Sequence, residues 1–171
     1  MVEARHSVRN FDGRQVEKEK IAKILKAALG APSSKNTRSS SFMVVDTPEL
    51  LKRIAGMRDF GSAFIAGAPL AILVMGDPEK TDLWKENASI SATYLQLAAQ
   101  SLGLGSCWVH VDGRPCRRDD PSAGYAEDYL KSFLPVPEGR HVLCAVAIGY
   151  PASATEAVRR ESADDGRVIT L

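Results

Sequence analysis

The sequence predicts an α+β domain in which several helices surround one sheet. Its 171 residues are 44% hydrophobic and 25% charged, a composition typical of a globular chain that buries a substantial core. Apolar residues recur at helical spacing in some segments and form short uninterrupted runs in others. These segments follow one another in a mixed order, which favours α+β over a repeating β-α-β arrangement. No repeat or linker divides the sequence, so we expect one domain over residues 1–171.

Four helices are predicted from apolar residues spaced by three or four positions. Glycine and proline residues mark some of their ends. Gly30 and Pro32 terminate the first, and Pro48 begins the second. The longest has small inward residues such as Ala88 and Ala92, which allow another backbone to approach closely. It is therefore either a central helix or a helix at a subunit interface. In chain order the helices are one ending at Leu29, then Glu49–Met57, 82–102 and Tyr125–Leu134.

Four apolar runs predict buried strands, and polar segments between them predict loops. The tail over 151–166 is polar, whereas Val168-Ile169-Thr170 is β-prone. An apolar segment in that place suits docking, with the sheet of a partner subunit as one candidate surface. The expected strands are Phe42–Val45, Leu70–Met75, Ser106–Val111 and His141–Ile148, and the expected loops are 31–41, 58–69 and 112–124.

Charge and cysteine content exclude several classes of protein. The 22 basic and 21 acidic residues balance, so nothing in the total charge favours a nucleic acid partner. The three cysteines lack metal-binding or disulfide spacing and are expected to be free thiols. No signal peptide is recognised, and the longest apolar stretch, Ala63–Met75, is too short to span a bilayer. We expect a cytoplasmic protein without a membrane partner.

Two polar clusters are candidates for ligand binding. Arg5-His6-Ser7-Val8-Arg9 has two guanidinium groups and a hydroxyl, which can grip a phosphate, although a solvated N-terminal arm has the same composition. Pro32-Ser33-Ser34-Lys35-Asn36 offers hydroxyl and amide groups at close range, although an ordinary turn is also rich in these residues.

Other chemistries find less support in the sequence. Gly103-Leu104-Gly105 follows a helix and precedes a strand, the reverse of a dinucleotide-binding fingerprint. The three histidines form no metal-ligand motif, so no metal site is expected. Cys107 and His110 are three apart in a predicted strand and should point to opposite faces, which argues against a nucleophile–base pair.

The order of these motifs resembles the nitroreductase family of flavoproteins. RHSVR is followed by APSSKN, then by a small-residue helix ending in GLGSCW, then by a strand ending in AIGYP. The resemblance runs from about residue 4 to residue 151. It implies an α+β nitroreductase-like fold with a central, mixed but mainly antiparallel sheet flanked by helices. It also implies an intertwined homodimer with FMN at the interface.

The resemblance assigns roles to single residues. It implies that Arg5 and Ser7 bind the FMN phosphate, that His6 contacts the phosphate–ribityl region and that Arg9 reaches the N1/O2 edge of the flavin. The other subunit would supply Pro32, Ser33, Ser34 and Asn36. Trp108, Val109 and His110 would pass the flavin edge, with a backbone N–H near His110 at N5. Arg159 or Arg160 would also reach the phosphate, and spacing does not choose between them.

The implied function is an FMN-dependent oxidoreductase with ping-pong kinetics. Hydride from NAD(P)H would pass through flavin N5 to an electron-poor small molecule such as a nitroaromatic or a quinone. No catalytic side chain is required. The alternatives are a flavin enzyme of another reaction type, such as a dehalogenase or a flavin-fragmenting enzyme, and a non-catalytic flavin-binding or regulatory module. The chain departs from the family where Thr37 and Arg38 replace Gln-Pro, and where Asn87 stands at an often acidic helix start.

Overall fold

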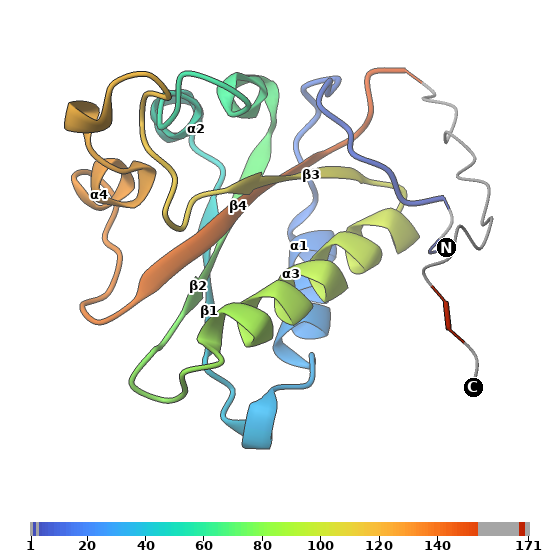
Figure 1. Ribbon diagram of the computed structural model, residues 1–171. Coiled ribbons are helices and arrows are strands. Elements are labelled where there is room, and N and C mark those ends of the chain that lie inside the picture. Colours follow the sequence, from blue (N-terminus) through green and yellow to red (C-terminus); the bar gives the residue numbers. More distant parts are fainter. Residues whose placement is uncertain (1, 3, 154–167, 170–171) are drawn as a thin grey trace.

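The computed structural model describes residue 2, residues 4–153 and residues 168–169 (Figure 1). Its helices and strands agree in number and order with the expected ones, and their ends differ by a few residues. The helices are α1 (Lys18–Leu29), α2 (Pro48–Ala55), α3 (Trp84–Ser101) and α4 (Ala126–Lys131). The strands are β1 (Ser40–Val45), β2 (Leu70–Gly76), β3 (Gly105–His110) and β4 (His141–Gly149). Three short 3-10 turns are η1 (Ser34–Asn36), η2 (Ala63–Gly67) and η3 (Pro121–Ala123).

The four strands form one sheet in the order β1-β2-β4-β3, and every neighbouring pair is antiparallel. The parallel component of the described sheet is a single bridge between Ser7 and Ser106. β1 begins two residues earlier than expected, because Ser40 and Ser41 pair with the last residues of β2. The order leaves β3 at an edge of the sheet, so half of its backbone groups face away from β4.

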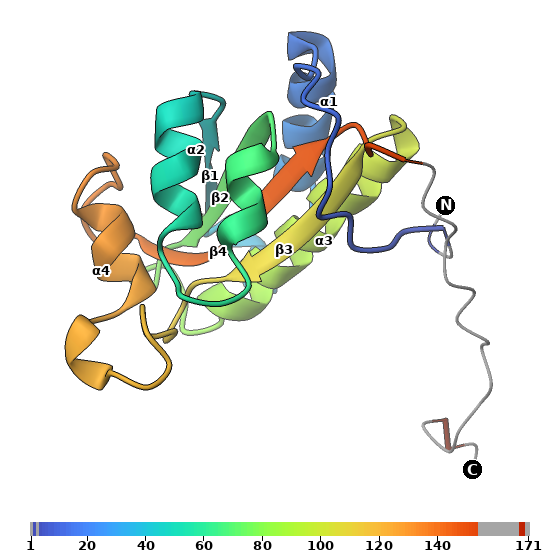
Figure 2. The ribbon, with the colours of Figure 1, turned by 90° about the horizontal axis from the view of Figure 1, so that it is seen from above.

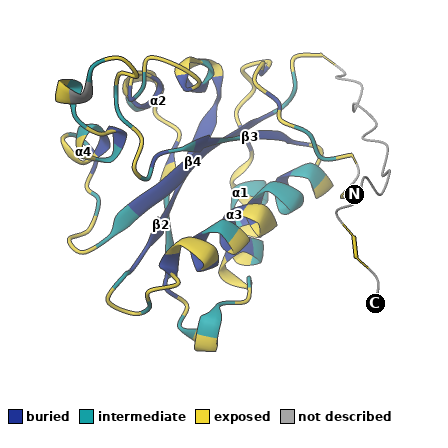
Figure 3. Ribbon diagram, in the orientation of Figure 1, coloured by how far each residue is buried: buried dark blue, intermediate teal, exposed yellow. Residues whose placement is uncertain are grey.

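Helices cover both faces of this sheet, and each face has its own apolar core (Figure 2). α1 and α3 pack on one face, where Ile24 and Leu95 are completely buried. α2, η2 and α4 pack on the other, where Ile54 and Leu130 are completely buried. β2 and β4 lie between these layers, and most of their residues are coloured dark blue, as buried, in Figure 3. Their uninterrupted apolar sequences follow from burial on both sides.

The small residues of α3 pack inside the apolar core of this chain. Ala88, Ala92 and Ala99 are completely buried, and α3 packs closely on α1 and on the strands. The prediction of a central helix is therefore confirmed. Beside this buried face, the N-cap residue Leu83 and the α3 residues Ile90 and Tyr94 are exposed, among polar residues such as Lys85 and Thr93.

The structure describes two residues of the β-prone C-terminal segment that the sequence predicts. Val168 and Ile169 are 66% and 83% exposed and lie in no strand among the described residues. Neither of these two residues is therefore part of the sheet, and Thr170 lies outside the described residues. Across the described part of the chain, we find no helix with the length and apolarity that crossing a membrane requires.

Candidate functional site

The predicted phosphate motif lies along the free edge of β3. Ser7 bridges Ser106, and the Val8 backbone N–H donates to the Ser106 carbonyl oxygen at 3.0 Å. The Val8 side chain is buried against Gly105, where an added Cβ would lie 2.7 Å from Val8. Gly105 is therefore required for this close approach.

Side chains of the motif gather around the first half of β3. Burial raises the pKa of the Cys107 thiol, while the charges of Arg9 and Arg5 and a hydrogen bond from Ser7 oppose that rise. These three side chains thus lie near one point on the strand. Within residues 4–153, neither arginine forms an ion pair, although the Arg9 guanidinium lies 5.9 Å from the centre of the Phe64 ring. Two guanidinium groups are left available for an anion.

His6 leaves one buried nitrogen without a partner. Its Nδ1 lies 3.0 Å from the Ala4 carbonyl oxygen, whereas Nε2 is buried and makes no hydrogen bond to the described residues. Buried polar atoms in proteins are nearly always paired. An orphaned nitrogen beside two available arginines therefore indicates a missing ligand atom.

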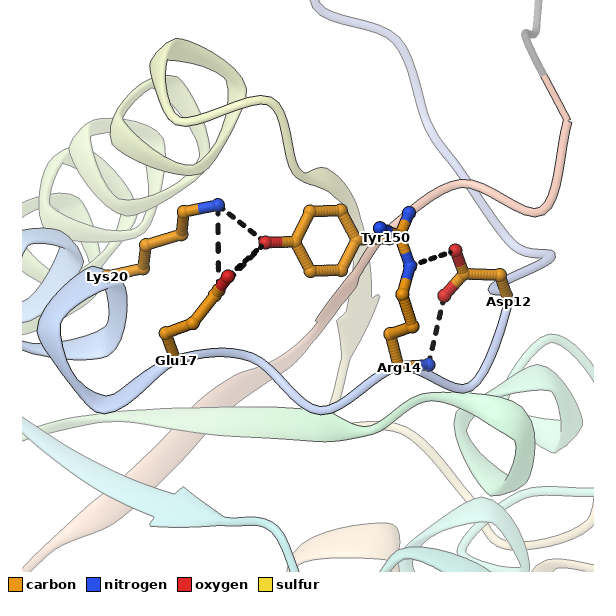
Figure 4. Close-up of polar contacts among 5 residues, drawn as sticks. All are labelled: Asp12, Arg14, Glu17, Lys20 and Tyr150. Carbon is orange, nitrogen blue, oxygen red and sulfur yellow. Dashed lines mark hydrogen bonds and ion pairs between the residues drawn. The ribbon is translucent and has the colours of Figure 1, made fainter.

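The chain that follows this motif is held by a cluster of polar contacts around Tyr150, here called the clasp, which consists of Asp12, Arg14, Glu17, Lys20 and Tyr150 (Figure 4). The Tyr150 hydroxyl donates to Glu17 at 2.8 Å and accepts a hydrogen bond from Lys20. On the other side, Arg14 stacks 4.1 Å from the Tyr150 ring centre while its Nε binds Asp12 at 2.6 Å. The clasp fixes the segment from Asp12 to Lys20 to the end of β4, and so limits the movement of the motif before it.

The second half of β3 presents backbone amides at the same edge. Because the Ser106 carbonyl points away from β4, strand alternation points the backbone groups of Trp108 and His110 the same way. The His110 carbonyl does accept a hydrogen bond from Arg58 at 3.4 Å, from outside the sheet. Val109 instead faces the core. The predicted flavin edge is therefore an exposed row of amides.

Cys107 and His110 project to opposite faces of β3, as predicted. The rings of Trp108 and His110 stack with centres 6.1 Å apart, which places both on one face. Cys107 alternates with them along the strand and lies on the other face. A nucleophile–base pair between Cys107 and His110 is therefore excluded.

The Pro32–Asn36 segment is a strained turn. Lys35, Asn36 and Arg38 have φ angles of 49°, 53° and 46°, a left-handed conformation that costs non-glycine residues energy. Pro32 and Asn36 are exposed, while Ser33 and Ser34 are half-buried. Such strain persists only where surrounding contacts impose it.

Asn87 supplies those contacts. Its side chain is 2% exposed; its Oδ1 accepts the Ser34 backbone N–H at 2.8 Å, and its Nδ2 donates to Ser39 at 3.0 Å and Thr37 at 3.3 Å. The sequence marked Asn87 only as a departure from an acidic helix start. Its role depends on the fold, which places the first turn of α3 against this turn.

The two predicted clusters do not meet within one chain. In Figure 1 the turn η1 lies below α3, whereas the segment that contains Arg5 to Arg9 runs along β3 at the upper right. Arg159 and Arg160, the candidate phosphate ligands after β4, lie outside the described residues. A single chain therefore brings together Arg5, His6, Ser7, Arg9, Trp108 and His110, and leaves Pro32, Ser33, Ser34 and Asn36 elsewhere.

Comparisons with known proteins agree with this geometry. The model of the nitroreductase family matches residues 2–58 and 56–150. A protein of Archaeoglobus fulgidus, provisionally named NADH dehydrogenase/NAD(P)H nitroreductase, is 36% identical over 155 residues, which cover 88% of this chain and 83% of that protein.

Solved structures are similar over almost the whole chain. An FMN-dependent nitroreductase of Clostridium difficile R20291 superposes with a TM-score of 0.90 at 42% identity, covering 99% of this chain and 98% of that one. A protein of Bacteroides thetaiotaomicron with the same provisional name as the archaeal relative has a TM-score of 0.86 at 30% identity, with coverages of 99% and 94%.

Proposed function

The chain belongs to the nitroreductase family, and we propose that it is an FMN-dependent NAD(P)H oxidoreductase that reduces an electron-poor small molecule. The single observation that carries the proposal is the set of unsatisfied groups along the edge of β3. Two arginines without ion pairs and a histidine nitrogen without a partner among the described residues lie in the segment beside β3, whose Trp108 and His110 backbone groups face away from β4.

This set of groups fits FMN. Arg5 and Ser7 would bind the phosphate, because guanidinium and hydroxyl groups supply charge-assisted and neutral hydrogen bonds to its oxygens. The orphaned Nε2 of His6 would contact the phosphate or the ribityl chain. From Ser106 to His110 the edge extends about 13 Å at 3.3 Å per residue, so one extended ligand can contact both ends.

Residues of the chain would tune and orient the cofactor. FMN, when bound, supplies a two-electron carrier between NAD(P)H and the acceptor. Arg9 would place a positive charge at the N1/O2 edge, where it favours the anionic reduced form. A backbone N–H near His110 would donate to N5 and so fix the distance and tilt of the ring system. No side chain of this site needs to carry a proton or form a covalent bond.

A second copy of the chain would complete the site. In Figure 1 the turn η1 lies apart from the segment that contains Arg5 to Arg9, so Pro32, Ser33, Ser34 and Asn36 would reach the flavin from the other chain. Three exposed apolar residues of α3 and its N-cap, Leu83, Ile90 and Tyr94, would contribute to a surface for such a partner. We therefore propose a homodimer in which each FMN contacts both chains.

Two further statements belong to this proposal. We propose one domain over residues 1–171, and this is supported by the described residues, which build their two cores on the faces of one sheet. The protein works in the cytoplasm, because Cys107, Cys116 and Cys144 are free thiols, as a reducing compartment would keep them.

The proposal is tested by cofactor extraction followed by reduction. Heat denaturation of the purified protein should release FMN, and addition of NADH or NADPH should bleach the flavin absorbance of the holoprotein. Reoxidation by a nitroaromatic or a quinone should then follow a ping-pong rate law. Release of FAD alone would contradict the cofactor assignment. FMN that neither nucleotide reduces would favour a non-catalytic flavin-binding module.

A further inference from the structure

Arg58 lies beside the last residue of β3, and its own backbone is held in place by neighbouring segments. It follows α2 and precedes η2 in the chain. Its carbonyl accepts a hydrogen bond from the hydroxyl of Ser62 at 3.1 Å, and Ser62 is completely buried. The backbone N–H of the next residue, Asp59, donates to the Cys116 carbonyl at 2.9 Å. These contacts fix the point from which the Arg58 side chain extends.

The Arg58 guanidinium reaches the point where the regular pairing of β3 with β4 ends. One of its terminal nitrogens donates to the carbonyl of His110, the last residue of β3, at 3.4 Å. Beyond His110, the backbone N–H groups of Val111 and Asp112 both donate to the Leu143 carbonyl, at 2.9 and 3.2 Å. Two successive amides that share one carbonyl mark an irregular end of the ladder. Arg58 therefore holds the last peptide of β3 from the side that β4 does not contact.

The same guanidinium has one buried donor without a partner. The Nε atom of Arg58 is buried and makes no hydrogen bond to the described residues. Nε and the terminal nitrogen that binds His110 belong to one rigid, planar group, so the available donor lies close to the His110 peptide. Buried polar atoms in proteins are nearly always paired. We therefore expect the missing acceptor beside the end of β3.

The positive charge of Arg58 persists in this position. Burial lowers the pKa of Arg58, Arg114 lowers it further, Asp59 raises it and Arg118 lowers it. The guanidinium nevertheless stays protonated at neutral pH, because its ordinary pKa is 12.5. The acceptor that suits such a donor best is an oxygen that carries negative charge or gains it during a reaction.

We propose that Arg58 is a further FMN-binding residue, which donates its Nε–H to the flavin ring oxygen next to N5 while its terminal nitrogen holds the His110 carbonyl. The inference rests on the proposed function, which assigns the backbone N–H near His110 to N5. The N–H and C=O of one residue point the same way in an antiparallel strand, so Arg58 and the His110 N–H face the same end of the ligand. The oxygen beside N5 belongs to a ring carbonyl, which gains negative charge when the flavin is reduced. Arg58 thus acts at this end of the ring, and Arg9 at the N1/O2 edge.

The test replaces Arg58 in the full-length protein. Arg58→Met keeps a long side chain but removes its charge and donors, whereas Arg58→Lys keeps the charge without the planar group that serves two acceptors. Lys52→Gln is the matched control, because it removes one positive charge from an exposed position on α2. The readouts are FMN titration of the apoprotein and the midpoint potential of the bound flavin, measured with dithionite. Neither readout requires NAD(P)H or turnover.

Arg58→Met should weaken the binding of oxidised FMN by about 10-fold, the lower end of the loss that follows removal of one charge-assisted hydrogen bond. Reduced FMN carries more negative charge, so its binding should weaken by a further factor of about 10. That factor lowers the two-electron midpoint potential by about 30 mV. Arg58→Lys should lose a similar part of the affinity but keep most of the potential, because its charge remains. Lys52→Gln should change neither quantity.

The midpoint potential decides whether Arg58 acts on the flavin or only supports the fold. A potential that is unchanged in Arg58→Met, or that falls equally in Arg58→Met and Arg58→Lys, would overturn the assignment and leave the proposed function intact. If urea unfolding shows that Arg58→Met does not fold, Arg58→Lys carries the test, and FMN affinity equal to that of the unchanged protein would overturn the assignment.

Failure of the proposed function gives a different pattern, because it is seen in the unchanged protein. FMN that binds but that neither NADH nor NADPH reduces would overturn the oxidoreductase, while the titration and the dithionite potential would still test Arg58. An unchanged protein that binds no FMN would overturn both.

Discussion

Replacement of Asn87 by alanine should weaken FMN binding from a position that touches no flavin. Asn87 makes three hydrogen bonds to the turn over residues 34–39. At about 0.5–1.5 kcal/mol each, their loss amounts to roughly 2–4 kcal/mol, since the freed groups of Ser34 and Ser39 are partly or fully buried. Relaxation of the left-handed residues in the turn offsets part of this loss. We therefore expect a net destabilisation of about 1–3 kcal/mol.

The assays are urea unfolding of the apoprotein and FMN titration by flavin fluorescence. A loss of about 1–3 kcal/mol corresponds to a fall in Tm of roughly 2–12 °C for a chain of this length. Ser89→Ala is the matched control: Ser89 lies on the same helix, and among the described residues its hydroxyl donates only to the Lys85 carbonyl, so stability should change by about 0.5 kcal/mol or less. FMN affinity should fall in Asn87→Ala alone. A destabilised Asn87→Ala protein with unchanged FMN affinity would refute the assignment of the turn to the flavin site.

Three further perturbations test other parts of the site. Arg9→Ala should lower the flavin reduction potential as well as FMN affinity, whereas Arg5→Ala should lower affinity by about 10- to 150-fold and leave the potential unchanged; potentiometric titration separates them. Gly105→Ala should displace the segment of Val8 and destabilise the fold by about 1–3 kcal/mol in urea unfolding, while Gly67→Ala, where an added Cβ meets nothing within 4 Å, should not. The pKa of His110 in the folded protein is lowered from its ordinary 6.5, so the unfolded chain binds more protons near that pH. The free energy of unfolding should therefore fall as the pH drops through about 6.5. In urea titrations between about pH 8 and pH 5.5, the His110→Gln protein should lose less stability than the unchanged protein.

The helices and strands were predictable because their signals are local. Gly30 and Pro32 after α1, and Pro48 at the start of α2, mark the ends of helices through backbone chemistry alone. The boundaries of β1 were less predictable. Ser40 and Ser41 are polar, and only their pairing with β2 makes them part of the strand.

The site was predictable as far as its residues lie in one segment. Arg5, Ser7 and Arg9 lie within five residues, and their side chains are suited to a phosphate, although a solvated arm has the same composition. Asn87 and Arg58 depend on contacts between elements far apart in sequence, with partners 53 and 52 residues away. No local pattern carries that information.

The small residues of α3 carried an ambiguity that only the structure resolves. Ala88 and Ala92 suit a partner subunit and a sheet equally well, since both need close approach of a backbone. In the fold they are buried in the core that α3 shares with α1 and the sheet, and the exposed apolar side chains left for a partner are larger, namely Leu83, Ile90 and Tyr94. A proposed dimer therefore rests on the outer side of α3, not on its small residues.

The central claim is that each FMN site contains Arg5 of one chain and Asn36 of the other. It is tested most directly by co-refolding Arg5→Ala chains with Asn36→Ala chains and counting tight FMN sites by titration. In a shared-site dimer, every mixed pair has one doubly damaged site and one intact site. Random pairing should therefore restore about a quarter of all sites to wild-type affinity, although neither parent binds tightly. A mixture that binds no better than its parents, or a monomer that binds FMN tightly, would contradict the account.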